Sequence, residues 1–177
     1  MATLKPCLLI SGLLLTMAAH SACTKNEQTN DAAKAPLSRA EAEQMALEKY
    51  PGSYLIGSEI EVEEGKTLFE IEVRASANAY ELSIDAATRE IIETEDNTMD
   101  FQADSTAGKA PLWTVSLADR DAAETAALQA CPGQTQQWKA ATTEGREVFS
   151  FKIKNEAGEI KKIVVQAGTN EVLEAKP

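Results

Sequence analysis

Histidine is almost absent from this sequence of 177 residues, which contains His20 alone. That residue lies in an N-terminal segment that we expect to be removed, so we expect the mature chain to lack histidine metal ligands and a histidine general base. The sequence also lacks a Gly-x-Ser-x-Gly motif, a Cys-x-x-Cys pair and a glycine-rich phosphate loop. These absences predict a protein that is not an enzyme and has no cofactor.

Positive charge is also scarce, because 17 Lys and Arg residues stand against 28 Asp and Glu residues, for a formal net charge of -11. A nucleic-acid partner is therefore excluded, since phosphate binding needs a face rich in Lys and Arg. Asp96, Asn97, Asp100 and Asp104 carry oxygen ligands that suit calcium, but they lack the spacing and the turn glycine of a calcium loop. We expect no metal site there.

The first residues have the pattern of an export signal. Lys5 precedes an apolar stretch over residues 7–19, and the small residues Ser21 and Ala22 follow it. This apolar stretch is shorter than the roughly 20 residues that cross a bilayer. We therefore predict a signal peptide over residues 1–22 and a polar tether over residues 23–36.

Two processing routes are open at the end of this signal. The segment His20-Ser21-Ala22-Cys23 resembles the lipobox of bacterial lipoproteins, although His20 stands where an aliphatic residue is usual. The resemblance implies lipidation at Cys23 and attachment to the membrane only through the lipid. Thr24 after that cysteine would suit the outer membrane of a Gram-negative bacterium. The alternative is ordinary signal peptidase cleavage, which would leave a soluble periplasmic or secreted protein.

Cys131 has a role that depends on this choice. If Cys23 is acylated, Cys131 is the remaining thiol of the mature chain; otherwise the two cysteines could pair in an oxidising compartment. No histidine is expected to activate Cys131 as a nucleophile. We expect Cys131 to be a small buried apolar residue.

The mature sequence repeats itself. Three blocks align at an offset of 80 or 81 residues: 37–52 with 118–133, 64–73 with 144–153, and 88–93 with 169–174. Such self-similarity indicates one structural unit present twice. We predict two repeats, residues 37–95 and 116–177, joined by a linker over residues 96–115.

Each repeat begins with a predicted helix. Ser38 and Glu41 form a capping box, in which each side chain bonds a backbone amide that the first turn leaves free. By alignment, Asp119 is predicted to cap the second helix. Pro51-Gly52 and Pro132-Gly133 end the two helices.

The rest of each repeat alternates apolar and polar residues, which predicts antiparallel strands with one face in solvent. Five carboxylates occupy alternating positions and are predicted on that solvated face: Glu59, Glu61, Glu63, Glu70 and Glu72. Trp113 and Trp138 are either core residues or exposed anchors for a partner. The predicted fold class is α+β, with two tandem repeats, each of one helix packed on a sheet of about four antiparallel strands.

Four segments of the first repeat resemble the PepSY domain: Tyr50-Pro51-Gly52, Glu64-Gly65-Lys66, Phe69 to Val73, and Tyr80 to Ile92. In the last of them, Arg89 stands where the family usually has glycine. The second repeat departs further, with Gln166 in place of the family's Asp and Asn170 in place of Gly. Its assignment as PepSY-like depends on the internal alignment.

The resemblance implies an exported, non-catalytic module. PepSY domains occur in propeptides of thermolysin-type proteases, which inhibit and help to fold the enzyme, and as free-standing periplasmic or lipid-anchored proteins. The tandem plan also resembles the architecture of beta-lactamase inhibitory protein. We therefore expect the protein to bind or inhibit a protein or peptide partner in the cell envelope, with a protease as one candidate. The alternative is a structural envelope lipoprotein with no discrete partner site.

Overall fold

A computed structural model of the chain describes residues 35–176, which belong to one compact unit. The predicted signal peptide, most of the predicted tether and the predicted lipidation site at Cys23 lie outside the described residues. No helix within residues 35–176 combines the length and the apolar character needed to cross a membrane.

Three helices and eight strands follow one another along these residues. In chain order they are α1 (Arg39–Lys49), β1 (Tyr54–Glu63), β2 (Lys66–Ala75), β3 (Asn78–Asp85), β4 (Ile91–Asp96), α2 (Thr98–Thr106), α3 (Leu117–Ala130), β5 (Gly133–Thr143), β6 (Arg146–Asn155), β7 (Ile160–Gln166) and β8 (Val172–Lys176). The predicted α+β class is confirmed.

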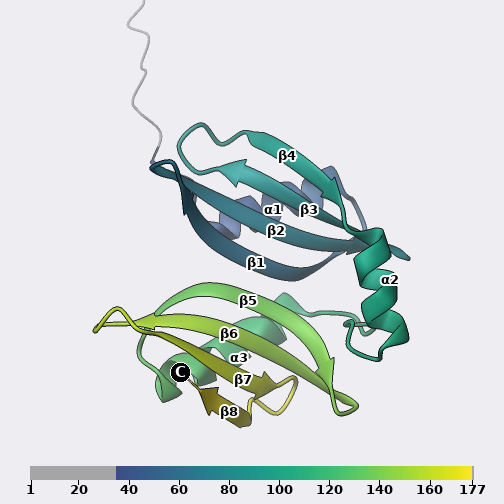
Figure 1. The fold of residues 1–177 in the computed structure, drawn as a ribbon, viewed down its shortest axis with the longest axis vertical. Helices are drawn as coiled ribbons and strands as arrows, with labels where there is room; N and C mark the ends of the chain where they lie inside the picture. Colours follow the sequence, from purple (N-terminus) through teal and green to yellow (C-terminus); the bar gives the residue numbers. More distant parts are fainter. Residues whose placement is uncertain (1–34, 177) are drawn as a thin grey trace, which may run out of the picture. The chain divides into compact units, whose positions relative to one another are not determined.

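All eight strands form a single antiparallel sheet in the order β4-β3-β2-β1-β5-β6-β7-β8 (Figure 1). Helix α1 packs on β1 and β2, and α3 packs on β5 to β8. The sheet is continuous because β1 pairs with β5 at Gly57–Lys139, Ser58–Trp138 and Glu59–Gln137. The strands of the two halves therefore share one sheet, where the sequence predicted a separate sheet of about four strands for each repeat.

Of the two predicted helix caps, the one at Ser38 is correct and the one at Asp119 is wrong. The backbone amide of Ser38 donates to the Glu41 carboxylate over 2.9 Å, and the Ser38 hydroxyl accepts from the Glu41 amide, so the capping box of α1 is present. Helix α3 is capped by Ser116, whose hydroxyl accepts from the Asp119 amide, and Asp119 lies inside the helix. The alignment misplaced this cap because α3 begins almost one turn earlier than α1 does at the offset of 81.

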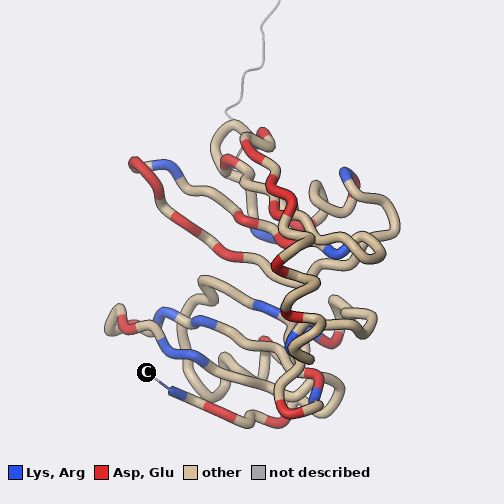
Figure 2. Tube along the Cα trace, turned by 45° about the vertical axis from the view of Figure 1, so that its right-hand side comes forward, with Lys and Arg blue, Asp and Glu red and all other residues tan. Residues whose placement is uncertain are grey.

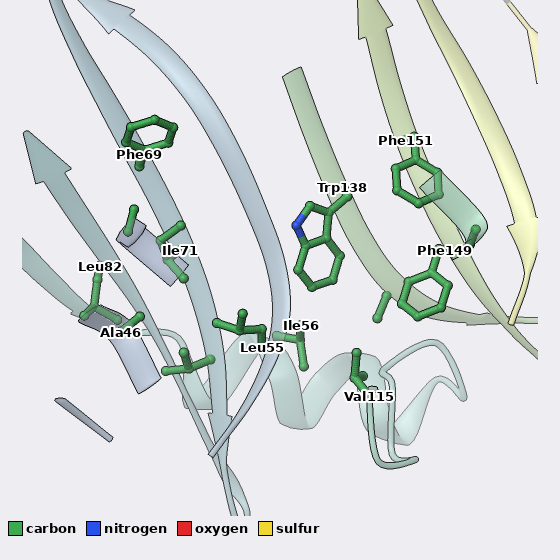
Figure 3. Close-up of a cluster of buried hydrophobic side chains, with 14 of the residues drawn as sticks. Ala46, Leu55, Ile56, Phe69, Ile71, Leu82, Val115, Trp138, Phe149 and Phe151 are labelled. Atoms are coloured by element: carbon green, nitrogen blue, oxygen red, sulfur yellow. The ribbon is translucent and has the colours of Figure 1, made fainter. Parts of the chain in front are cut away.

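The core lies between the helices and the inner face of the sheet (Figure 3). The helices contribute fully buried alanines, such as Ala46 of α1 and Ala127 of α3, which allow each helix to sit close to the strands. Trp138 is fully buried, and the half-buried Trp113 packs edge-on against Phe149 with ring centroids 5.3 Å apart. Both tryptophans thus belong to the core rather than to an exposed anchor.

The predicted linker, residues 96–115, contains α2 and is attached to the sheet. The backbone amide of Ala79 on β3 donates to the Thr98 hydroxyl over 3.2 Å. The guanidinium of Arg74 on β2 donates to the carbonyl of Pro111 over 2.7 Å. These contacts place α2 against one end of the sheet (Figure 1).

Candidate functional site

The sheet has one face that neither α1 nor α3 covers, which we call the open face. Its side chains are those at the alternate strand positions that point away from the core. The paired row nearest its centre crosses all eight strands, from β8 to β4: Lys176, Lys162, Lys152, Gln137, Glu59, Glu70, Ser83 and Glu93. Charge of one sign thus occupies each end of this row.

The rest of the open face continues this separation. On β1 to β4 most outward charged residues are acidic, although Lys66 and Arg74 also lie there, and the acidic ones form the acidic half: Glu59, Glu61, Glu63, Glu70, Glu72, Glu81, Glu93 and Glu95. On β5 to β8 most are basic, although Glu174 also lies there, and they include the basic half: Lys139, Lys152, Lys154, Lys162 and Lys176. In Figure 2, Asp and Glu are frequent along the strands of the first half, and Lys or Arg along those of the second. Alternation along the sequence predicted that the carboxylates of β1 and β2 lie on a solvated face. That the basic half lies beside them follows only from the pairing of β1 with β5 in the structure.

Ion pairs cross the boundary between the two halves. Lys139 Nζ lies 2.5 Å from the Glu72 carboxylate, and Lys152 Nζ lies 3.2 Å from the Glu59 carboxylate. Gly57 of β1 pairs with both Glu72 and Lys139, and a Cβ at this position would lie 3.3 Å from Glu72 Cδ and 3.4 Å from Lys139 Cγ. Because Gly57 has no side chain, it leaves space above β1 for Glu72 and Lys139 to form their ion pair.

Away from this boundary the acidic half is short of counter-charge. Partial burial, together with the neighbouring carboxylates of Glu61, Glu81, Glu59 and Glu63, raises the pKa of Glu70 to about 7. Burial and then the charge of Glu72 also raise the pKa of Glu81, against the opposing effect of Lys139. A cation brought to this surface would therefore be attracted to it.

The raised pKa of Glu70 predicts a pH-dependent stability. Because the pKa is higher in the folded chain, the stability that this group contributes is present below about pH 4.5 and is lost as the pH rises through about 7. Glu70→Gln keeps the neutral form at every pH. Its unfolding free energy in urea should gain about 1 kcal/mol relative to the parent chain between pH 5 and pH 8, after allowance for solvent screening.

The control for this measurement is Ser83→Ala, which removes an uncharged side chain that pairs with Glu70 across the open face. Its effect on the unfolding free energy should not vary with pH. A Glu70→Gln difference that stays constant from pH 5 to pH 8 would contradict the assignment.

A second polar cluster lies in the core, and the sequence reasoning missed it. Glu43 of α1 and Arg120 of α3 are 3% and 4% exposed. The Arg120 guanidinium donates to both carboxylate oxygens of Glu43 over 2.8 and 3.1 Å, and the Trp138 indole NH donates to the same carboxylate over 2.8 Å. With these donors in place the buried charges are paired, so the cluster joins the two helices and leaves no group free for chemistry.

A sequence signal for this cluster existed. Arg39 and Glu43 are four residues apart, as are Arg120 and Glu124, and the two pairs correspond at the offset of 81. In the structure the partners are exchanged, because Arg39 also binds Glu124, over 2.9 and 2.6 Å. An Arg and a Glu repeated at helical spacing in both halves can thus indicate contact between the two helices.

Helix α2 and the open face enclose a pocket of about 360 Å³. Three residues considered for calcium, Asn97, Asp100 and Asp104, line it, whereas Asp96 does not. Within residues 35–176 no group of three or more His, Cys, Asp and Glu side chains is arranged to hold a metal ion. Four carboxylates line the pocket, those of Glu72, Glu81, Asp100 and Asp104.

Cys131 lies at the C-terminal end of α3 and is half-buried. Its thiol forms no disulfide in the part of the chain that the structure describes. The expectation of a buried apolar residue is thus met only partly, and the pairing with Cys23 lies outside the described residues.

Comparison with known proteins identifies part of this fold. Residues 36–95 match the family model of PepSY, the peptidase propeptide and YPEB domain. Among curated proteins, none matches the chain. A crystal structure of a "putative lipoprotein" from Clostridium difficile 630 is similar in fold, with a TM-score of 0.50 and 18% identity over 80% of this chain and 93% of that chain. The resemblance to PepSY is confirmed, and the protein contains a PepSY domain over residues 36–95.

Proposed function

We propose that this protein is an exported, non-catalytic PepSY module that binds a protein or peptide partner across its open face. The observation that carries this proposal is the separation of charge on the sheet face that, within residues 35–176, neither α1 nor α3 covers. Complementary charge guides the encounter of two proteins and fixes their orientation. A partner that offers a basic patch to the acidic half and an acidic patch to the basic half would match it.

A peptidase is the first candidate partner, because the matching family model is described as a peptidase propeptide domain. In that case binding would inhibit the enzyme in trans. All residues of the acidic half lie within the matched residues 36–95, and β5 adjoins this half from outside them. The PepSY domain itself would therefore make the primary contact with a partner.

We also propose that the chain is two copies of one unit. Helix α1 precedes β1 to β4 as α3 precedes β5 to β8, which supports this relation. The exchanged pairs Arg39–Glu124 and Arg120–Glu43 support it as well, because each pair is the counterpart of the other at an offset of 81.

Residence in the cell envelope is part of the proposal and rests on the predicted signal peptide, with Cys23 as the proposed lipid anchor. Mass spectrometry of the mature N-terminus tests it directly. A diacylglycerol-modified Cys23 would support anchoring, whereas an unmodified N-terminus would leave a soluble periplasmic or secreted protein.

Partner binding is tested by capture from envelope extract with the immobilised chain. We expect a stoichiometric partner at low salt that is lost at high salt, since screening weakens contacts between exposed charges. Glu61→Lys with Glu70→Lys reverses charge in the acidic half and should abolish capture. Glu156→Lys with Glu171→Lys makes the same charge change at exposed turn residues and should retain it.

Equal capture by both double variants would refute the role of the open face. Failure to recover any partner with the parent chain would favour the alternative of a structural envelope lipoprotein. If the captured protein is a peptidase, its hydrolysis of peptide substrate should fall as the parent chain is added, and should not fall with the acidic-half variant.

A further inference from the structure

The pocket beneath α2 combines an apolar lining with carboxylates. Its apolar residues include Ile56 of β1, Phe101 of α2 and Ala140 of β5. Glu81 of β3 and Asp100 of α2 both line it, one from the sheet and one from the helix. A ligand held here would meet both apolar side chains and carboxylates.

The charges of this pocket do not cancel. Four carboxylates line it against the two ammonium groups of Lys109 and Lys139, and Lys139 is already paired with Glu72 at 2.5 Å. Among the described residues, the carboxylates of Glu81, Asp100 and Asp104 form no ion pair. The pocket thus has unpaired negative charge, which disfavours an anionic ligand and favours a cation.

The size of the pocket restricts the cation. A volume of about 360 Å³ lies at the lower end of the roughly 300–1,000 Å³ typical of ligand pockets. Arginine and lysine side chains have the matching form, because each carries a cationic head on an aliphatic stem that packs well on apolar surface. A charged side chain inserted into a pocket is also a usual anchor of protein interfaces.

We propose that this pocket receives an arginine or lysine side chain of the partner polypeptide. The inference rests on the proposed function, since it names the contact by which a partner on the open face would be anchored. It places the specificity of that face at α2, a helix in the segment that the sequence assigns to a linker.

The test is an NMR titration of the uniformly ¹⁵N-labelled chain with single amino-acid derivatives. N-acetyl-arginine methylamide and N-acetyl-lysine methylamide separate the two cationic heads. N-acetyl-citrulline methylamide and N-acetyl-norleucine methylamide keep the stem and remove the charge. We expect saturable shifts of the Glu81, Phe101 and Ala140 amides with at least one cationic derivative and none with the neutral pair.

Two variants make the test specific to the pocket. Glu81→Gln removes a lining carboxylate and should weaken binding about tenfold, the effect of a lost charge-assisted contact. Glu93→Gln lies in the acidic half but outside the pocket, and it should leave the affinity within about twofold. The amide spectrum of each variant shows directly that it is folded.

Absence of saturable shifts would overturn the inference, as would equal shifts with the neutral derivatives. An equal loss in both variants would also overturn it, since binding would then belong to the whole acidic half. If the pocket binds no derivative while the parent chain still captures a partner through the open face, the inference fails and the proposed function stands. If the pocket binds arginine but capture is insensitive to charge reversal of the face, the proposed function fails instead.

Discussion

Replacing Arg120 by methionine is expected to lower the free energy of unfolding by about 3–5 kcal/mol, the usual result of removing one partner of a buried ion pair. The Glu43 carboxylate would remain 3% exposed and would lose the two hydrogen bonds from the guanidinium. It would keep the Trp138 indole as a donor and Arg39 at 3.6 Å, which do not replace a charge in direct contact. Urea unfolding followed by circular dichroism measures the change.

The double variant Glu43→Met with Arg120→Met removes both buried charges and should recover most of the lost stability, because no unpaired carboxylate is left. Arg146→Met is the matched control, since Arg146 pairs with Glu144 at 3.0 Å on the surface. Its cost should stay below about 1 kcal/mol. If Arg120→Met costs no more than this control, the buried cluster does not stabilise the fold as described.

Trp138→Ala is expected to destabilise the chain by about 3–5 kcal/mol, the range for large aromatic truncations in a core. The ring is fully buried, its centroid lies 6.2 Å from that of Phe149, and Arg120 lies 4.8 Å above it. Truncation therefore removes apolar packing, a cation–π contact and the hydrogen bond to Glu43 together. Differential scanning calorimetry gives the loss as a lower midpoint of unfolding.

Trp138→Phe separates these effects, because it keeps a ring in the core and removes the indole NH. We expect a cost of about 1–3 kcal/mol, the penalty for leaving part of a buried acceptor unsatisfied. The effects of Trp138→Ala and Arg120→Met should not add, since both act on the Glu43 carboxylate. Strict additivity would show that the indole and the guanidinium act independently.

Local patterns predicted the elements of this fold well. The strands follow from alternation, as in Phe69 and Ile71, which are buried between the outward Glu70 and Glu72. The start of α1 follows from the Ser38 capping box, and the ends of both long helices from the Pro-Gly pairs just after them. These features depend on residues close in sequence, which is why one sequence suffices to find them.

Features that join distant segments could not be predicted in the same way. The pairing of β1 with β5 has no local signature, because Ser58 and Trp138 are far apart in sequence. The burial of Glu43 depends on Arg120 of the other half, so the pattern within its own helix does not indicate it. The residues of α2 are mostly polar, so its position against the sheet, and with it the pocket, could not be predicted from periodicity.

The three residue pairs between β1 and β5 have a consequence for the PepSY domain taken alone. These pairs cover the backbone of β1 from Gly57 to Glu59, whereas a fragment limited to residues 36–95 would leave that stretch without a neighbouring strand. An exposed strand edge with unpaired backbone groups can pair with another chain and lead to aggregation. By pairing with β1, the C-terminal half therefore protects the PepSY domain against self-association.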